Sequence, residues 1–199
     1  MKNKKIEKSQ LIPYVIDKSD KGERTYDIFS RLLEDRIIFL TGPITMASAN
    51  VIIAQFLFLQ SVDKTKDIQF YLNTPGGEVS ATLAIYDVMQ FVKPDVATYC
   101  IGTAASGGSI LLVGGAKGKR FILPYSEVMI HQPHGGLQGQ VTDLDIYMKL
   151  YAKHKEQLID IYVKHTGQKR AKIAEDVERD FWLQGEEAVK YGIVDKVIK

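Results

Sequence analysis

The sequence predicts an α/β fold built around a mostly parallel sheet. Strand-like and helix-like runs alternate three times from residue 36 onward, which is typical of repeated βαβ units. Two glycine-rich turns, at 73–77 and 102–108, follow strand-like runs. Because the sites of such sheets lie outside the carboxyl ends of the strands, we expect both turns at one edge of the sheet.

Composition and charge narrow the class of protein. The chain has 199 residues, 45% of them hydrophobic, so we expect one compact domain, or one domain with an appendage. The net charge of +2 calls for neither a nucleic-acid nor a membrane partner. The single cysteine, Cys100, rules out an internal disulfide and fits a reducing compartment.

No targeting signal is expected at the N-terminus. The basic start at residues 1–8 is followed only by a short apolar run at 11–16, which a proline interrupts. No stretch approaches the roughly 20 apolar residues that span a bilayer. We therefore expect a cytoplasmic protein, in which residues 1–24 form a flexible, extended arm and residues 25–199 form the folded domain.

The folded domain divides into alternating elements. Hydrophobic periodicity and turn residues predict helices at about 26–33, 47–60, 78–91, 107–115, 142–165, 171–177 and 186–191. The same reasoning predicts strands at 36–40, 67–72, 95–101, 120–123, 127–131, 181–183 and 194–198. The helix at 142–165, with Thr142 as its cap and Gly167 as its stop, would project beyond a compact domain. Its aromatic residues favour oligomerisation.

Ser106 is the candidate nucleophile. It lies between small residues, where the strand ending at Ile101 passes into an apolar helix. Small neighbours let the backbone turn sharply and let a substrate carbonyl approach closely. The alternative interpretation is tight packing alone. An oxyanion hole could be formed by the N–H of Gly107 and a second N–H from the turn at Gly76 and Gly77.

A serine nucleophile needs a base and an acid that orients the base. Of the four histidines, His154 and His165 stand among lysines on the long helix and are expected on a solvated face. His131 ends an apolar strand, as a rigidly held base would, and His134 follows in a glycine-rich loop. Asp180, which precedes Phe181, is the preferred acid, although a salt bridge with Arg179 would also explain it. The alternative acids are Asp143, Asp145 and Asp176.

Other motifs do not fit. The run 114–120 lacks the first glycine of a phosphate loop, because Val113 stands there, and Arg120 replaces its Ser/Thr. His131 and His134 enclose a proline and are not on a helix, so no metal site is predicted. We expect Cys100 to be a small core residue, and no cofactor in this chain.

Beyond these candidates, the sequence from about Tyr14 to Ile198 resembles the ClpP family, the peptidase subunits of ATP-dependent Clp proteases (peptidase family S14). The resemblance rests on many motifs in the family's order. They are Gly22-Glu23-Arg24, Arg31-Leu32-Leu33, Asn73-x-Pro75-Gly76-Gly77, Tyr86-Asp87, Lys93-Pro94-Asp95-Val96, the run 114–120, Met129-Ile130-His131-Gln132-Pro133, His165-Thr166-Gly167-Gln168 and Glu186-x-Ala188 with Tyr191-Gly192.

This resemblance implies a ClpP/crotonase fold and a serine endopeptidase that cuts unfolded proteins to short peptides. Its triad would be Ser106, His131 and Asp180, with Gly77 and Gly107 as oxyanion donors. The family assembles as two stacked heptameric rings around a chamber. Residues 132–166, a strand at 135–140 followed by the long helix, would be the handle that joins the rings.

The resemblance also implies several binding surfaces. Substrate would add as a strand beside Gly135 and Gly136, and Glu178 with Arg179 would form an inter-ring ion pair. AAA+ unfoldases such as ClpX, ClpA or ClpC would use the ATP and dock in a cleft. That cleft would be lined by Tyr71, Phe91 and Ile101.

Two positions depart from the family pattern. Gly107 stands where methionine is usual, so we expect a less preorganised oxyanion hole and a changed side-chain pocket. His134 stands where an apolar residue is usual, beside the substrate strand. The alternatives are a catalytically silent ring subunit that acts in assembly with a paralogue, and a crotonase-type acyl-CoA enzyme. The latter would need neither Ser106 nor His131.

Overall fold

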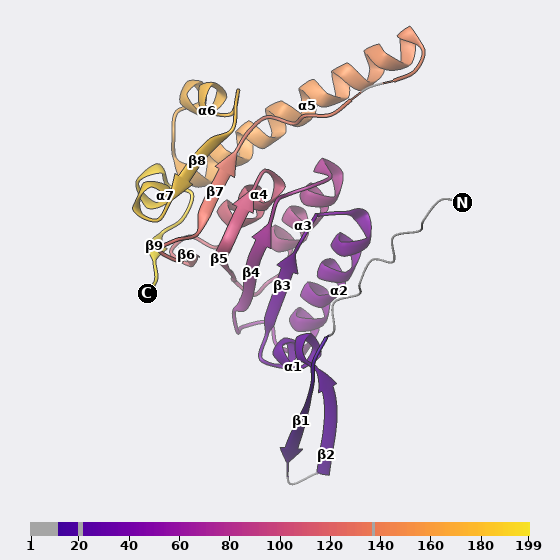
Figure 1. Ribbon diagram of the computed structural model, residues 1–199, viewed down its shortest axis with the longest axis vertical. Helices are drawn as coiled ribbons and strands as arrows, with labels where there is room; N and C mark the ends of the chain where they lie inside the picture. The colour runs from indigo at the N-terminus through magenta and orange to yellow at the C-terminus, as the bar shows by residue number, and fades with distance from the viewer. Residues whose placement is uncertain (1–11, 20–21, 137) are drawn as a thin grey trace, which may run out of the picture.

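A twisted sheet forms the centre of the molecule (Figure 1). This computed structural model describes residues 12–19, 22–136 and 138–199. Within them, seven strands make the central sheet, and β3, β4, β5, β6 and β9 follow one another in parallel. Its strands are β3 (Ile37–Thr41), β4 (Ile68–Thr74), β5 (Val96–Ala105), β6 (Arg120–Ile122), β7 (Glu127–Ile130), β8 (Phe181–Gln184) and β9 (Lys196–Val197).

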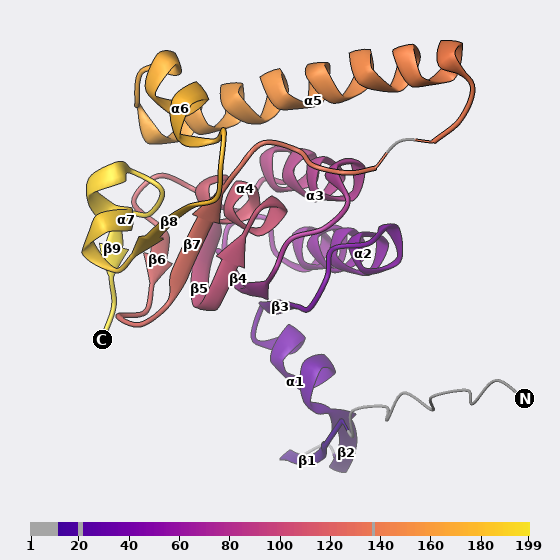
Figure 2. The same cartoon turned by 45° about the horizontal axis from the view of Figure 1, so that its top comes forward.

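Helices cover the sheet. Figures 1 and 2 place α2, α3 and α4 on the same face of it. The helices are α1 (Ile28–Glu34), α2 (Met46–Val62), α3 (Val79–Phe91), α4 (Gly107–Val113), α5 (Val141–Thr166), α6 (Arg170–Asp176) and α7 (Glu186–Tyr191). The predicted α/β class, with a mostly parallel sheet, is confirmed.

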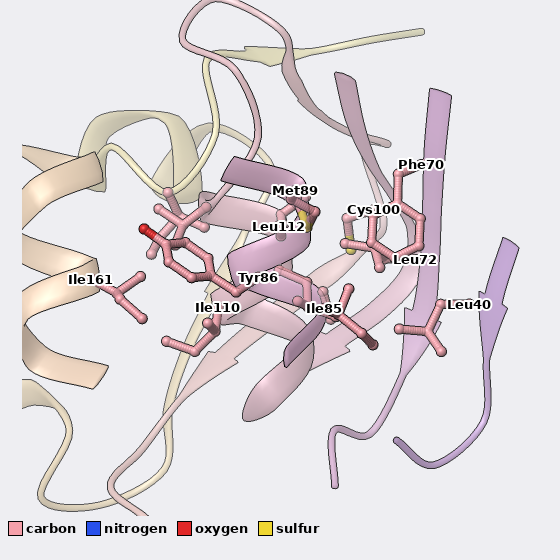
Figure 3. Close-up of a cluster of buried hydrophobic side chains, with 14 of the residues drawn as sticks. Leu40, Phe70, Leu72, Ile85, Tyr86, Met89, Cys100, Ile110, Leu112 and Ile161 are labelled. Atoms are coloured by element: carbon pink, nitrogen blue, oxygen red, sulfur yellow. The ribbon is translucent and has the colours of Figure 1, made fainter. Parts of the chain in front are cut away.

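The core lies between this face of the sheet and the helices. On β4, Ile68, Phe70 and Leu72 are buried, and the residues between them are less so, as the period of two in a strand requires. Figure 3 shows part of the cluster, in which Leu40, Phe70, Leu72 and Cys100 of the sheet lie near Ile85, Tyr86, Met89, Ile110, Leu112 and Ile161 of the helices. Burial raises the pKa of the Cys100 thiol to about 11, which suits a core residue.

The N-terminal segment is paired, where a single extended arm was expected. β1 (Tyr14–Ser19) and β2 (Gly22–Asp27) form an antiparallel hairpin. The expected boundary at residue 24 falls inside β2, whereas residues 1–11 and 20–21 of the expected arm lie outside the described residues. Asp27 then caps α1, because its Oδ1 accepts hydrogen bonds from the N–H groups of Phe29 and Ser30, both at 3.0 Å.

Helix α5 extends away from the sheet, as expected from its length (Figure 1). Its C-terminal part is anchored by buried residues such as Leu158 and Tyr162, whereas Ile146 and Met148 near its start are 58% and 61% exposed. Gly167 ends the helix in the left-handed conformation, as predicted. The cap position is Gln140, however, so the expectation of Thr142 was wrong.

The segment before α5 also differs from expectation. Within the described part of 132–140, which leaves out residue 137, no strand is present. The described residues of the expected strand at 135–140 are therefore irregular chain in this single protomer. It runs close to α5, since a Cβ added to Gly135 would stand 2.9 Å from the Tyr151 hydroxyl oxygen.

Candidate active site

Ser106 lies at a sharp turn between β5 and α4. Its φ of 53° and ψ of −119° are unusual for a residue with a side chain, and such strain costs about 1–3 kcal/mol. Backbone hydrogen bonds hold the turn, among them one from the Ser106 N–H to the Met129 carbonyl at 2.8 Å and one from the Ser109 N–H to the Ser106 carbonyl at 3.0 Å. Strain maintained in this way is typical of functional residues.

His131 reaches Ser106 because the strands that precede the two residues are neighbours. β5 and β7 pair in parallel, with Ala105 opposite Met129. The His131 Nε2 atom lies 2.8 Å from the Ser106 Oγ atom, and the His131 side chain is only 11% exposed. This distance is a hydrogen bond of ordinary length.

Asp180 completes a hydrogen-bonded line of three side chains. β7 and β8 pair antiparallel with Ile130 opposite Phe181, which sets His131 beside Asp180. The Asp180 Oδ1 atom lies 3.1 Å from the His131 Nδ1 atom. Three segments far apart in the sequence thus bring together Ser106, His131 and Asp180.

Two of the other candidate acids have partners elsewhere. Asp176 accepts a hydrogen bond from the Tyr191 hydroxyl at 2.6 Å and pairs with Lys172. Asp145 pairs with Lys149 along α5, and Asp143 belongs to the first turn of the same helix.

The glycine turn after β4 lies against Ser106, so both turns share one edge of the sheet, as predicted. A Cβ added to Gly76 would stand 2.7 Å from the Ser106 Cβ and 2.8 Å from the Gly107 nitrogen. Ile44 and Gly77 form an isolated parallel β-bridge. The Ile44 N–H donates a hydrogen bond to the Gly76 carbonyl at 2.8 Å, and the Ile44 carbonyl accepts one from the Glu78 N–H at 2.9 Å. In such a bridge the Gly77 N–H points away from Ile44.

These residues line one cleft of about 810 Å³. Its walls include Ser106, His131 and Asp180 together with Gly76, Gly77, His134, Glu178 and Arg179. The rings of His131 and His134 lie edge to face, with centroids 5.0 Å apart. A hydrogen bond from Lys155 lowers the pKa of Glu178, so Glu178 already has a cationic partner within its own chain.

The remaining candidates lie outside this cleft. Gly135 lines a neighbouring cavity of about 370 Å³ beside α5, and Gly136 follows it in the irregular segment. Tyr71 on β4 stacks between Phe39 and Tyr99, with ring centroids 5.1 and 4.5 Å away. Phe91, the last residue of α3, is 71% exposed, and Ile101 on β5 is partly buried.

His165 is not on a solvated face, contrary to expectation. It lies at the buried end of α5, where its Nε2 atom is 2.8 Å from the Tyr86 hydroxyl oxygen. Burial first, and then the charges of Lys164 and Arg120, lower the pKa of His165 to about 4. Arg120 itself is buried and paired with Asp195, which gives the basic run at 114–120 a structural role.

Thr82 is a site residue that the sequence reasoning missed. It lines a small cavity with Ser106, Gly107 and His131, and its side chain is buried. The only sequence signal is its position on α3, since it shares the helical spacing of the buried residues Ile85, Tyr86 and Met89.

Two further properties concern the described residues as a whole. None of the helices within 12–19, 22–136 and 138–199 is long and apolar enough to cross a membrane. In that same part of the chain, no three His, Cys, Asp or Glu side chains are grouped so that they could hold a metal ion.

Ser106, His131 and Asp180 are hydrogen-bonded in a line at the edge of an α/β sheet. This arrangement is typical of serine hydrolases. Comparison with protein families agrees with this class, since the Clp protease family matches residues 20–199. The chain therefore belongs to the Clp protease family, and its fold is the ClpP fold that the sequence predicted. It is a ClpP-type peptidase.

Proposed function

We propose that this chain is a serine endopeptidase that hydrolyses unfolded proteins to short peptides, with Ser106, His131 and Asp180 as its catalytic triad. The observation that carries the proposal is the line of two hydrogen bonds, 2.8 Å from Ser106 to His131 and 3.1 Å from His131 to Asp180. Membership of the Clp protease family supports the reaction class.

In this mechanism, Asp180 accepts the hydrogen bond of the His131 Nδ1–H, which leaves the Nε2 lone pair facing Ser106. As the Ser106 Oγ attacks the peptide carbonyl carbon, the His131 Nε2 takes its proton. His131 then gives that proton to the leaving nitrogen, and the C–N bond breaks. The product is an ester on Ser106 and a released amine.

Water completes the cycle. It attacks the ester carbon while His131 takes its proton, and His131 returns a proton to the Ser106 Oγ as the ester bond breaks. In both steps the N–H groups of Gly77 and Gly107 stabilise the negative oxygen of the tetrahedral intermediate. The close approach of the two turns and the outward direction of the Gly77 N–H support this role.

The same proposal includes an assembly. Two stacked heptameric rings of this chain would enclose the active sites, with residues 132–166 as the handle between rings and Glu178 and Arg179 in an inter-ring pair. The projecting, largely exposed start of α5 supports a partner there. Substrate would lie beside Gly135 and Gly136 as an added strand, for which irregular chain near the cleft leaves room.

Unfolded substrate would be delivered by an AAA+ unfoldase, which supplies the ATP-driven work. Docking would involve Tyr71, Phe91 and Ile101, and the exposure of Phe91 supports part of this surface. We propose a cytoplasmic location, in keeping with the single, buried Cys100.

Replacing the nucleophile tests the function. Ser106→Ala should abolish cleavage of fluorogenic peptides by the purified oligomer, while the native mass of the assembly stays unchanged. If the wild-type homo-oligomer is inactive and gains activity only when mixed with a paralogue, the chain is instead the catalytically silent subunit. Undiminished peptidase activity in Ser106→Ala would refute the proposed nucleophile.

A further inference from the structure

Gly107 has no room for a side chain, because Thr82 occupies the space. A Cβ added to Gly107 would stand 2.3 Å from the Thr82 Oγ1, 3.2 Å from the Thr82 Cγ2 and 3.3 Å from the Ile44 Cδ1. Real Cβ atoms essentially never approach an oxygen to 2.3 Å. The Thr82 side chain on α3 therefore fills the space beside the turn where a side chain at position 107 would otherwise lie.

Thr82 is held rigidly in that position. It is 1% exposed, and its hydroxyl donates a hydrogen bond to the Glu78 carbonyl one turn earlier, at 3.0 Å. A β-branched side chain on a helix has few rotamers, and this hydrogen bond selects one of them. The methyl group and the hydroxyl oxygen thus form a fixed surface.

The hollow that Thr82 bounds is small and adjoins the proposed reaction centre. Its volume is about 20 Å³, against about 810 Å³ for the open cleft. The residues around it are Gly77, Val79, Thr82, Ser106, Gly107, His131, Pro133 and Leu158. The hollow is therefore far narrower than the open cleft, and we expect it to favour a small side chain over a branched or aromatic one.

We propose that Thr82 is a specificity-determining residue, which restricts the residue on the carbonyl side of the cleaved bond to a small side chain such as that of alanine or serine. This inference rests on the proposed function. A carbonyl placed between the Ser106 Oγ and the N–H groups of Gly77 and Gly107 has its own Cα next to this hollow, because all three residues line it. The open cleft leaves the other substrate side chains less restricted.

The first test compares fluorogenic peptides that differ only in having alanine, valine, leucine or phenylalanine before the cleaved bond. Wild type should have its highest kcat/KM with alanine. Thr82→Ala enlarges the hollow and should raise the leucine-to-alanine ratio of kcat/KM at least about tenfold, since one methylene in a pocket changes discrimination by that order. Thr82→Val is the matched control, because it keeps the volume and should change the ratio less than about threefold.

A second test uses the contact between the two residues. Gly107→Ala should lower kcat/KM in the wild type, since its Cβ meets Thr82. The same change in a Thr82→Ala background should cost much less, because the atoms at 2.3 and 3.2 Å are gone and only the flexible end of Ile44 remains close. Equal losses in both backgrounds would overturn the packing argument.

The two levels of the proposal fail in different ways. Wild-type protein that cleaves peptides through Ser106 but prefers leucine or phenylalanine contradicts the role of Thr82 alone, as does an unchanged ratio in Thr82→Ala. Wild-type protein that cleaves none of the peptides, and whose Ser106 does not react with a fluorophosphonate, overturns the proposed function and this inference with it.

Discussion

Asp180→Asn tests whether the hydrogen bonds between Ser106, His131 and Asp180 serve catalysis or result from packing alone. The asparagine keeps the size of Asp180 but can offer its NH2 group to the His131 Nδ1, which favours the tautomer with its proton on Nε2. That proton would then face the Ser106 Oγ, and His131 could no longer act as the base. We expect kcat to fall and KM to stay nearly constant.

The size of the loss follows from the surroundings of the pair. For a buried acid of a serine protease, this change costs about 10,000-fold. The Asp180 side chain is 62% exposed, and its hydrogen bond to the mostly buried His131 is 3.1 Å long. Since solvent screens the carboxylate and can partly replace it, we expect a loss of about 100- to 1000-fold in kcat/KM, or about 3–4 kcal/mol.

The assay is the hydrolysis of one fluorogenic peptide by equal concentrations of assembled protein. Asp35→Asn is the matched control, because the Asp35 side chain is 58% exposed and pairs with Arg31, far in sequence from the proposed site and handle. It should change kcat/KM less than about threefold. If Asp180→Asn behaves like this control, the proposed role of Asp180 is wrong.

Two further substitutions probe the turn and the buried end of α5. Gly76→Ala would place a Cβ 2.7 Å from the Ser106 Cβ and should lower kcat/KM more than about 100-fold, whereas Gly118→Ala, at a similar positive φ with open space around it, should not. The reverse order would refute the role of this close approach. Because the pKa of His165 is about 4 in the folded chain and about 6.5 when unfolded, stability should fall as pH falls from 6.5 to 4. Allowing for solvent screening, we expect His165→Gln to reduce this loss of stability by about 1 kcal/mol. Urea unfolding of both proteins at several pH values measures it, and parallel plots of unfolding free energy against pH for wild type and variant would contradict the prediction.

The order of elements could be predicted because hydrophobic periodicity and turn residues are local signals. The buried strands and the helices that pack on them follow this pattern, as does the end of α5 at Gly167. The β1–β2 hairpin could not be predicted in this way, since its strands are largely exposed and have no buried face to impose an alternating pattern. β5 continues to Ala105, beyond the expected end at Ile101, because it pairs with β7.

The candidate site divides along the same line. Residue types at strand ends indicated Ser106, His131 and Asp180 separately, and the strand pairings determine that they meet. The sequence around His165 is rich in lysine, which suggested solvent exposure. However, Tyr162 lies one turn earlier on the same helix and is buried, and His165 is hydrogen-bonded to Tyr86. Thr82 and Gly107 are 25 positions apart in the sequence. Only the three-dimensional structure shows that the Thr82 side chain fills the space that a side chain at position 107 would need.

Fluorophosphonate labelling followed by peptide mapping identifies the nucleophile itself. The reagent should form one adduct per chain on Ser106 in the assembled wild-type protein. Ser106→Ala and Asp180→Asn should show no labelling and markedly slower labelling, respectively. An adduct on any other residue, or a wild-type peptidase that stays active without reacting, would contradict the assignment of Ser106.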